Sequence, residues 1–353
     1  MTTDRQRLRP RGGTFVSLLL CLMLLVAAST SVAAARQASP PAGAAAVDAS
    51  GEVTLYTSVP QELIDGVKEV FEQTYPDVTL NVYRAGTGEV LARIQAETEA
   101  GATDTADVLW VADFTAAANL KEQDLLQAYE SPEGEAIPEN LKDPEGFFYG
   151  SRLINVVPIY NTNNVPEAPT TWNAFLDPAH EGRIAIPSVT ASGAAFYAVG
   201  TMVNHPDFGW EFFEAMRDNG GIQVANNGDA VSRVASGELD MAFGLDYMVR
   251  AQAEDGAPIA YAEPEEGIIM VASPVALMAG AQNPDAAKVF IEWVLSEAGQ
   301  RHMAETGVVP VRQGLEIEGI PTLDEIEAME SDAGVIGEQE AEIKERFGEL
   351  FEG

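Results

Sequence analysis

Small polar residues follow four strand-like runs of this sequence, at points where a helix or a turn is expected to begin. The four groups are Thr57-Ser58, Gly86-Thr87-Gly88-Glu89, Ser192-Gly193-Ala194 and Asn226-Asn227-Gly228. A helix N-terminus carries free N–H groups and about half a positive charge, so it binds anions without a basic side chain. Because the chain has only 20 Lys and Arg residues, this pattern predicts a site for a small, oxygen-rich ligand.

The turn at Ser192, Gly193 and Ala194 is a candidate anion cradle. Glycine lets the backbone approach an anion closely, while the serine hydroxyl and the following N–H groups point outward at the helix start. An ordinary serine N-cap, which stabilises a helix by about 1 kcal/mol, is the alternative interpretation.

Three further turns are candidates for ligand contact because they follow strands, and α/β sheets place ligands at that edge. Their candidate residues are Thr57 and Ser58 after the first strand, Thr87 and Gly88 after the second, and Asn227 with Asn226 after a later one. Asp113 ends the third strand in the same way. The asparagines have an alternative role in a turn that tolerates positive φ.

The charge balance excludes some partners. The chain has 55 acidic and 20 basic residues, a formal net charge of -35. Nucleic acid and anionic membrane surfaces are therefore disfavoured, because contacts with phosphate groups need cationic side chains. Such a surface is also typical of proteins that stay soluble at high salt, since ions screen its self-repulsion.

The N-terminus has the pattern of an export signal over residues 1–35. Arginines between residues 5 and 11 precede an apolar stretch, Phe15 to Ala28, and small residues follow at 32–35. An apolar stretch of about 14 residues is shorter than the roughly 20 of a spanning helix, although an uncleaved anchor is the alternative. Residues 36–50 are rich in Pro, Ala and Ser, which predicts a disordered linker. We therefore expect secretion to the periplasm or the cell surface.

After residue 50, short β-branched runs alternate with helical periodicity, which predicts an α/β fold with largely parallel sheets. Ser151 to Asn161 is a long extended run whose Pro158 favours an edge strand or a crossing segment. Ile259 to Ser273 is expected to cross back, and Asp324 to Phe351 to form an acidic helix. These crossings predict one lobe at 51–153 plus 263–312 and a second at 154–262 plus 313–353.

Several segments together resemble the solute-binding proteins of ABC importers, and among these the ferric-iron, phosphonate, sugar-phosphate and thiamine-binding group. The segments are ADVLW, VVPIYNTN, TTWNAFLDPAHEGRIAIPSVTASGAA, VASGELDMAFGLDY and NPDAAKVFIEWVLS. The resemblance implies a type II periplasmic-binding-protein fold, with two lobes joined by crossing strands and the ligand in the cleft between them. It also implies a monomer that performs no catalysis and delivers its solute to a membrane permease.

In the ferric members of that group, iron is held by two adjacent tyrosines, an acidic residue and a histidine, with phosphate or carbonate cradled by a Ser-Gly-Ala helix start. Carried onto this sequence, Glu89 fits the acidic position, Tyr247 the second tyrosine, and Ser192 to Ala194 the cradle. Asp246 stands at the first tyrosine position, and Val59 or Pro60 at the histidine position.

Glu89, Asp246 and Tyr247 would supply the hard oxygen donors that suit Fe3+. Each has a structural alternative, since Glu89 could complement a helix dipole and Asp246 could be an N-cap before Tyr247. The resemblance thus implies Fe3+ with a synergistic anion as the ligand, and no catalytic cofactor.

The sequence leaves open one alternative for the ligand and one for the class of protein. The ligand could be an organic phosphate or phosphonate, such as 2-aminoethylphosphonate, a hexose phosphate or thiamine phosphate, because one tyrosine and the histidine are missing. A secreted hydrolase that pairs Glu89 with Asp246 is the alternative from another class. The sequence contains no H-E-x-x-H, G-x-S-x-G or P-loop string.

Overall fold

The computed structural model describes residues 49–102 and 105–351. The predicted export signal and residues 36–48 of the predicted linker lie outside these ranges. Within the described ranges, no helix has both the length and the apolar character needed to cross a membrane.

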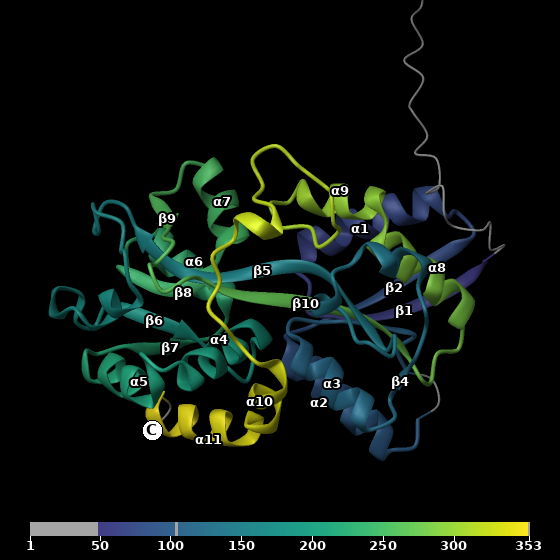
Figure 1. Ribbon diagram of the computed structural model, residues 1–353, viewed down its shortest axis with the longest axis horizontal. Coiled ribbons are helices and arrows are strands. Elements are labelled where there is room, and N and C mark those ends of the chain that lie inside the picture. Colours follow the sequence, from purple (N-terminus) through teal and green to yellow (C-terminus); the bar gives the residue numbers. More distant parts are fainter. Residues whose placement is uncertain (1–48, 103–104, 352–353) are drawn as a thin grey trace, which may run out of the picture. The chain divides into compact units, whose positions relative to one another are not determined.

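The strands of the described residues form one mixed sheet, in the order β2-β1-β3-β10-β5-β8-β6-β7, with β4 beside β10 and β9 beside β5 (Figure 1). They are β1 (Gly51–Thr57), β2 (Val78–Arg84), β3 (Val108–Trp110), β4 (Leu126–Gln127), β5 (Phe148–Asn161), β6 (Ile184–Pro187), β7 (Ile222–Val224), β8 (Met241–Leu245), β9 (Ile259–Tyr261) and β10 (Ile269–Met278). β1 pairs in parallel with β2 and β3, and β6 pairs in parallel with β7 and β8. We call these groups, with their helices, the β1 side and the β6 side.

β5 and β10 connect the two sides, since they pair antiparallel with each other and with the strands on either flank. Pro158 lies inside β5 opposite Phe243 of β8, while β9 pairs with the residues that follow it. The crossing-segment interpretation of this run is thus confirmed, and the edge-strand interpretation is wrong. The predicted return crossing at 259–273 is divided, because β9 ends at Tyr261 and β10 begins at Ile269.

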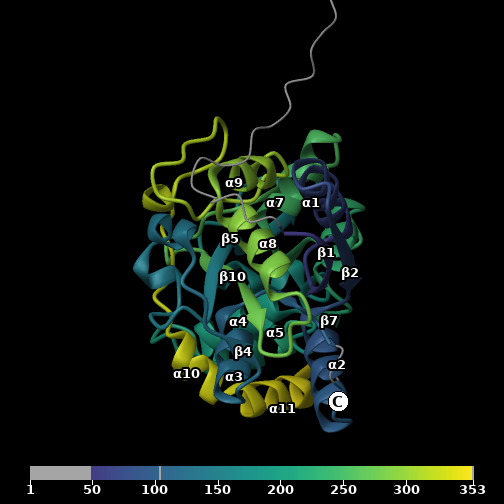
Figure 2. The same cartoon turned by 90° about the vertical axis from the view of Figure 1, so that its right-hand side faces the viewer.

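The α-helices cover both faces of the sheet (Figures 1 and 2). They are α1 (Gln61–Thr74), α2 (Thr87–Glu99), α3 (Phe114–Glu122), α4 (Gly193–Asn204), α5 (Gly209–Asp218), α6 (Asn227–Ala235), α7 (Asp246–Glu254), α8 (Pro284–Leu295), α9 (Glu297–Ala304), α10 (Ala333–Glu338) and α11 (Glu340–Phe351). α2, α4 and α6 each begin within one of the small polar groups, whose first residue is the N-cap: Gly86, Ser192 and Asn226.

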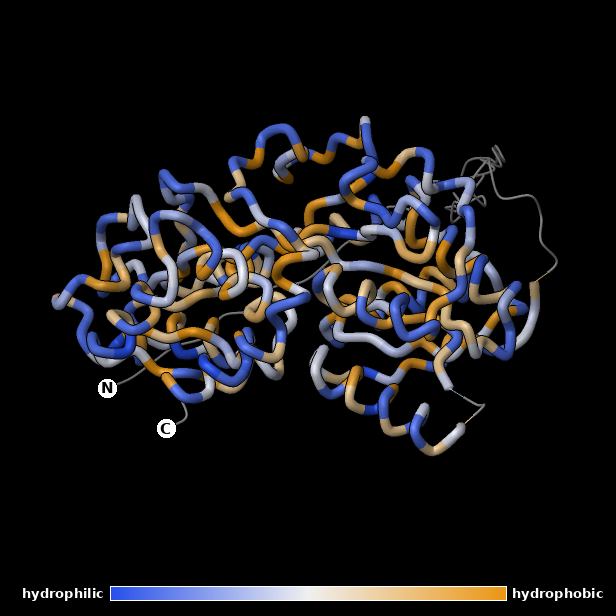
Figure 3. Tube along the Cα trace, turned by 60° about the horizontal axis from the view of Figure 1, so that its bottom comes forward, coloured by the Kyte–Doolittle hydropathy of each residue, from blue (hydrophilic) through white to orange (hydrophobic). Residues whose placement is uncertain are grey.

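Helical periodicity places apolar side chains toward the sheet. In α1, Leu63, Val67 and Phe71 recur at four-residue spacing and are buried. The Phe71 ring packs edge-on against Phe290 of α8, with 5.1 Å between ring centroids. Burying each such side chain contributes about 1.5–3 kcal/mol. Figure 3 shows the same separation along the chain, with hydrophobic segments inside and hydrophilic loops outside.

The C-terminal segment differs from its prediction. The expected single helix over 324–351 is two helices, α10 and α11, preceded by residues without α-helix. α11 packs on α4 and α5 of the β6 side, and α10 contacts both α4 and α3. The amide of Asn119, in α3, donates to Glu340 over 2.7 Å. The segment therefore touches the β1 side as well as the β6 side.

Candidate ligand-binding site

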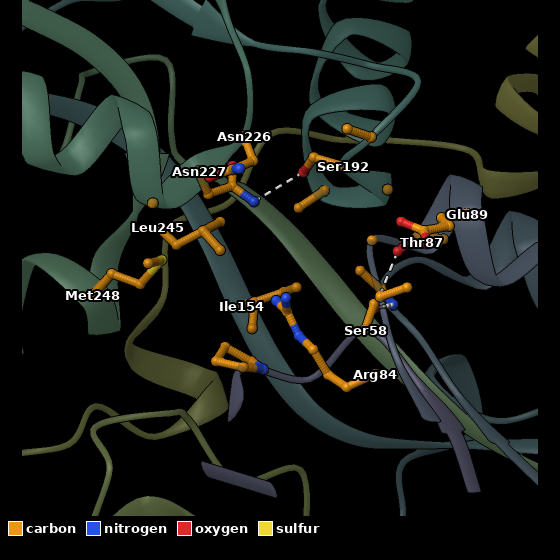
Figure 4. A pocket seen from close by; sticks show the side chains of 18 of the residues that line it. Ser58, Arg84, Thr87, Glu89, Ile154, Ser192, Asn226, Asn227, Leu245 and Met248 are labelled. Carbon is orange, nitrogen blue, oxygen red and sulfur yellow. Dashed lines mark hydrogen bonds between the residues drawn. The ribbon is translucent and has the colours of Figure 1, made fainter. Parts of the chain in front are cut away.

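A cavity of about 470 Å³ lies where the turns after β1 and β2 face the turns after β6, β7 and β8 (Figure 4). Most of the predicted ligand-binding residues line it. They are Ser58, Thr87, Glu89, Ser192, Gly193, Ala194, Asn227 and Tyr247. The structure thus brings together residues that are up to 189 positions apart in the chain (247 − 58).

On the β1 side, the hydroxyl of Ser58 is held as an acceptor. Its Oγ accepts hydrogen bonds from the Thr87 hydroxyl and from the Ala112 N–H, both over 3.0 Å. With both lone pairs occupied, the hydroxyl proton of Ser58 is the group left to interact with a ligand. This serine is therefore oriented as a hydrogen-bond donor toward the cavity.

On the β6 side, Ser192 has the same arrangement. Its Oγ caps α4 by accepting from the Ala195 N–H over 3.1 Å, and it also accepts from the Asn227 side-chain amide over 2.9 Å. The serine N-cap interpretation is therefore correct, and it is compatible with ligand contact because the hydroxyl proton remains free to be donated. Asn226 caps α6 with an extended φ of -165°, so the positive-φ interpretation is wrong for this residue.

Two arginines line the cavity, and sequence reasoning missed both. Arg152 is 2% exposed, and its Nε and Nη1 have no hydrogen-bond partner among the described residues. Burial lowers the pKa of Arg152, while the neighbouring Tyr247 acts in the opposite direction. Arg84, at the end of β2, donates to the Val59 carbonyl over 3.3 Å and reaches toward Ile154 (Figure 4). The available signal was a charged residue, Arg152, near the start of the long extended run at 151–161.

Tyr247 and Glu89 also line the cavity, but their environments differ. Tyr247 is buried, and this burial raises the pKa of its phenol, partly offset by the Arg152 guanidinium. The guanidinium carbon of Arg152 lies 6.0 Å from the centroid of the Tyr247 ring. Glu89 is exposed and accepts a hydrogen bond from the Tyr83 hydroxyl over 3.3 Å. The structure thus provides one neutral phenol and one solvated carboxylate.

Asp246 does not share this cavity, which corrects the expected three-residue metal set. Its carboxylate accepts from the Asn155 side-chain amide and from Arg250, each over 3.0 Å, and lines a different cavity. It is the first residue of α7 rather than its N-cap, which is Leu245. Among the residues that the structure describes, no group of three or more His, Cys, Asp or Glu side chains could hold a metal ion.

Besides Asp113, the N-cap of α3, two other candidates also lie outside the cavity lining. The hydroxyl of Thr57 donates to the Trp110 carbonyl over 2.6 Å and accepts from the Val59 N–H over 3.0 Å, so it fixes the turn after β1. Gly88 lines a much smaller space beside Thr190. Both residues therefore position the turns that carry Ser58 and Thr87.

Residues 53–309 match the family model described as bacterial extracellular solute-binding protein, so this chain belongs to that family. A probable ABC transporter periplasmic-binding protein of Sinorhizobium fredii is 29% identical over 66% of this chain and 67% of its own. Iron uptake protein A2 of Synechocystis is 27% identical over 77% of this chain and 81% of its own.

The fold is that of solved periplasmic binding proteins. The structure of AfuA from Actinobacillus pleuropneumoniae, solved with exogenous fructose-6-phosphate, matches with a TM-score of 0.78 and 24% identity, over 86% of this chain and 99% of AfuA. The expected type II periplasmic-binding-protein fold is therefore confirmed.

Proposed function

We propose that this solute-binding component of an ABC importer captures an organic solute that carries a phosphate or phosphonate group. The observation that supports it is Arg152, a buried guanidinium with two unpaired nitrogens at the cavity. A buried charge needs an opposite charge or hydrogen bonds to offset its desolvation. Guanidinium groups match the oxygens of phosphate in a bidentate geometry.

The rest of the lining supports an acceptor-rich ligand. Ser58 and Ser192 approach from opposite walls, each with its oxygen already occupied and its proton available. The first turn of α2 receives no side-chain cap from the described residues, so its N–H groups are available too. Arg84 adds a second positive charge to the lining.

Ferric iron with synergistic phosphate or carbonate is the second candidate. It is supported by the presence of Glu89 and Tyr247 in the cavity and by relatives named as iron uptake proteins. The cation would have to displace the phenol proton of Tyr247, whose pKa is raised by burial. It would also lie near two guanidinium groups, which repel it unless the anion intervenes. We therefore rank the organic anion first.

The remaining aspects of the proposed function follow from the family. Its relatives are named for solute binding and iron uptake, and the hydrolase alternative loses its paired carboxylates because Glu89 and Asp246 line different cavities. We propose secretion through the signal at residues 1–35, hinge closure between the predicted lobes, and delivery of the solute by a monomer to a membrane permease.

Calorimetric titration of the purified protein with fructose 6-phosphate, 2-aminoethylphosphonate, inorganic phosphate and ferric citrate tests this proposal. We expect saturable binding of at least one phosphorylated or phosphonate compound. A visible spectrum recorded with ferric citrate should show no new phenolate-to-iron charge-transfer band. A coloured ferric complex that the Tyr247→Phe variant fails to form would instead establish the iron assignment. An absence of binding to all phosphorus compounds would refute the first proposal.

A further inference from the structure

Two glycines bring the β1 side and the β6 side into direct contact beside the cavity. A Cβ atom added at Gly88, in the first turn of α2, would lie 1.9 Å from the Thr190 carbonyl oxygen. One added at Gly193, the first residue of α4, would lie 2.2 Å from Asp113 Oδ2 and 2.8 Å from the Ala112 carbonyl oxygen. Carbon–oxygen contacts this short do not occur, so these positions admit no side chain while the two sides touch.

The partners of the glycines have little freedom to move away. Thr190 and Ala112 present backbone carbonyls, and Asp113 is 2% exposed and fixed as the N-cap of α3. Asp113 also has a φ of 65°, which is unusual for a residue with a side chain. Strained backbone of this kind persists where surrounding contacts hold it in place, and it concentrates at functional sites.

The contact of Gly88 with Thr190 lies beside the cavity, whereas Gly193 and Ala112 of the second contact line it. Thr87, next to Gly88, and Ser192, next to Gly193, both line the cavity, whereas Gly88, Asp113 and Thr190 do not. A substitution at Gly88 would therefore act on the approach of the two sides, and its added methyl group would point at Thr190 rather than at a solute.

We propose that the contacts of Gly88 with Thr190 and of Gly193 with Asp113 form a closure stop, meaning that they limit how closely the two sides approach each other. Because these glycines have no side chains, the sides close far enough to bind solute, and the glycines therefore set the affinity for solute. This inference rests on the proposed function, because it assigns positioning residues for the same cavity. The glycines act by letting Ser58 and Ser192, on opposite walls, reach one ligand together. A bulkier residue keeps these two donors apart.

The Gly88→Ala variant tests this stop, and Gly66→Ala is its matched control. Gly66 lies within α1, where an added Cβ meets only the His302 ring, at 3.3 Å. Neither glycine has a positive φ, so alanine fits both backbones. We expect Gly88→Ala to weaken fructose 6-phosphate binding about tenfold or more, as overpacking typically costs, and to reduce the ligand-induced decrease in the radius of gyration measured by X-ray scattering. The Gly66→Ala protein should behave as the wild type.

Hydrogen exchange without ligand separates this inference from the proposed function. If the sides meet at this stop, amides at 188–193 should exchange faster in Gly88→Ala than in the wild type or Gly66→Ala. Suppose that the wild type binds no phosphorylated compound, while amides at 188–193 still exchange faster in Gly88→Ala. The proposed function would then be refuted, and the inference that these glycines limit closure would stand. Exchange and affinity in Gly88→Ala that equal those of the wild type would overturn the inference.

Discussion

The two walls of the cavity each present a serine hydroxyl in the same hydrogen-bonding arrangement, but they differ in their charged side chains. Ser58 on the β1 side and Ser192 on the β6 side each accept two hydrogen bonds and keep a proton for the ligand. The charged side chains of the lining, however, come from the β1 side and from β5, as Arg84, Glu89 and Arg152. Under the proposed function, both walls would orient the solute, while β5 and the β1 side would supply the electrostatic attraction.

The largest expected effect is at Arg152. We expect the Arg152→Met variant to bind fructose 6-phosphate roughly a hundredfold more weakly, because truncating one partner of a buried charge pair costs about 2–5 kcal/mol. The same variant should melt at a higher temperature without ligand, since it removes a buried charge that has unpaired nitrogens. Calorimetry and thermal melts measure the two changes.

The matched control is Arg217→Met, which alters an exposed arginine of α5 that pairs with Asp218. Its affinity should equal that of the wild type. If Arg152→Met lowered the melting temperature and left the affinity unchanged, Arg152 would be a structural residue. The proposed difference in electrostatic attraction between the two walls would then lose its main support.

The next effect concerns pH and the contact between the two sides. Burial raises the pKa of Asp113 to about 7, above its usual value near 3.8. Glu340 and Lys344 of α11 and Tyr197 of α4 are the titratable groups that also act on it. Opening the contact would expose the carboxyl to water and restore a lower pKa. The closed form therefore binds the extra proton, and closure weakens as pH rises toward 7.

The Asp113→Asn variant isolates this effect, because asparagine mimics the protonated carboxyl and still caps a helix. We expect the ratio of the wild-type Kd to the variant Kd for fructose 6-phosphate to increase between pH 5 and 7, by at most about tenfold per pH unit, and to level off above pH 7. Taking the ratio removes the ionisation of the probe itself. A ratio that does not vary with pH would show that Asp113 stays in one protonation state during closure.

Local rules predicted much of the fold and the polar half of the site. Small polar residues after a strand form turns and helix starts wherever they occur, so Ser58, Thr87 and Ser192 were found from their immediate neighbours. The family resemblance supplied the expectation of two lobes joined by crossing strands. The turns and helix starts depend on short stretches of sequence, and the structure has them at the predicted places. The ligand-binding roles of their residues remain predictions.

The parts that were missed depend on distant residues. Arg152 is exceptional only because it lies buried beside β10 and the rings of Trp110 and Tyr247. Asp246 lies outside the cavity because Asn155 and Arg250 hold its carboxylate. The sequence analysis looked for an anion site built without basic side chains, whereas Arg84 and Arg152 line the cavity. Low overall Lys and Arg content does not reveal where the few arginines lie.

A smaller effect is expected at Arg84, whose side chain is exposed although it lines the cavity. Since solvent screens an exposed charge, Arg84→Gln should weaken the binding of fructose 6-phosphate by only about three- to tenfold. The loss should shrink as NaCl is increased, whereas the loss at the buried Arg152 should persist. Calorimetry in low and high salt measures this difference, and equal salt dependence for the two variants would contradict it.

The smallest effects compare the two serines directly. Removing one neutral donor costs about 0.5–1.5 kcal/mol, so Ser58→Ala and Ser192→Ala should each weaken binding by about two- to tenfold. Ser192→Ala should in addition lower the free energy of unfolding by about 1 kcal/mol, because it removes the N-cap of α4. Urea melts and calorimetry on the two single variants and the double variant measure these changes in stability and affinity.

If both walls contact one solute in the closed form, the double variant should lose less affinity than the sum of the single losses, since the first loss already loosens the closure that the second depends on. Additive losses would mean that the two walls bind independently.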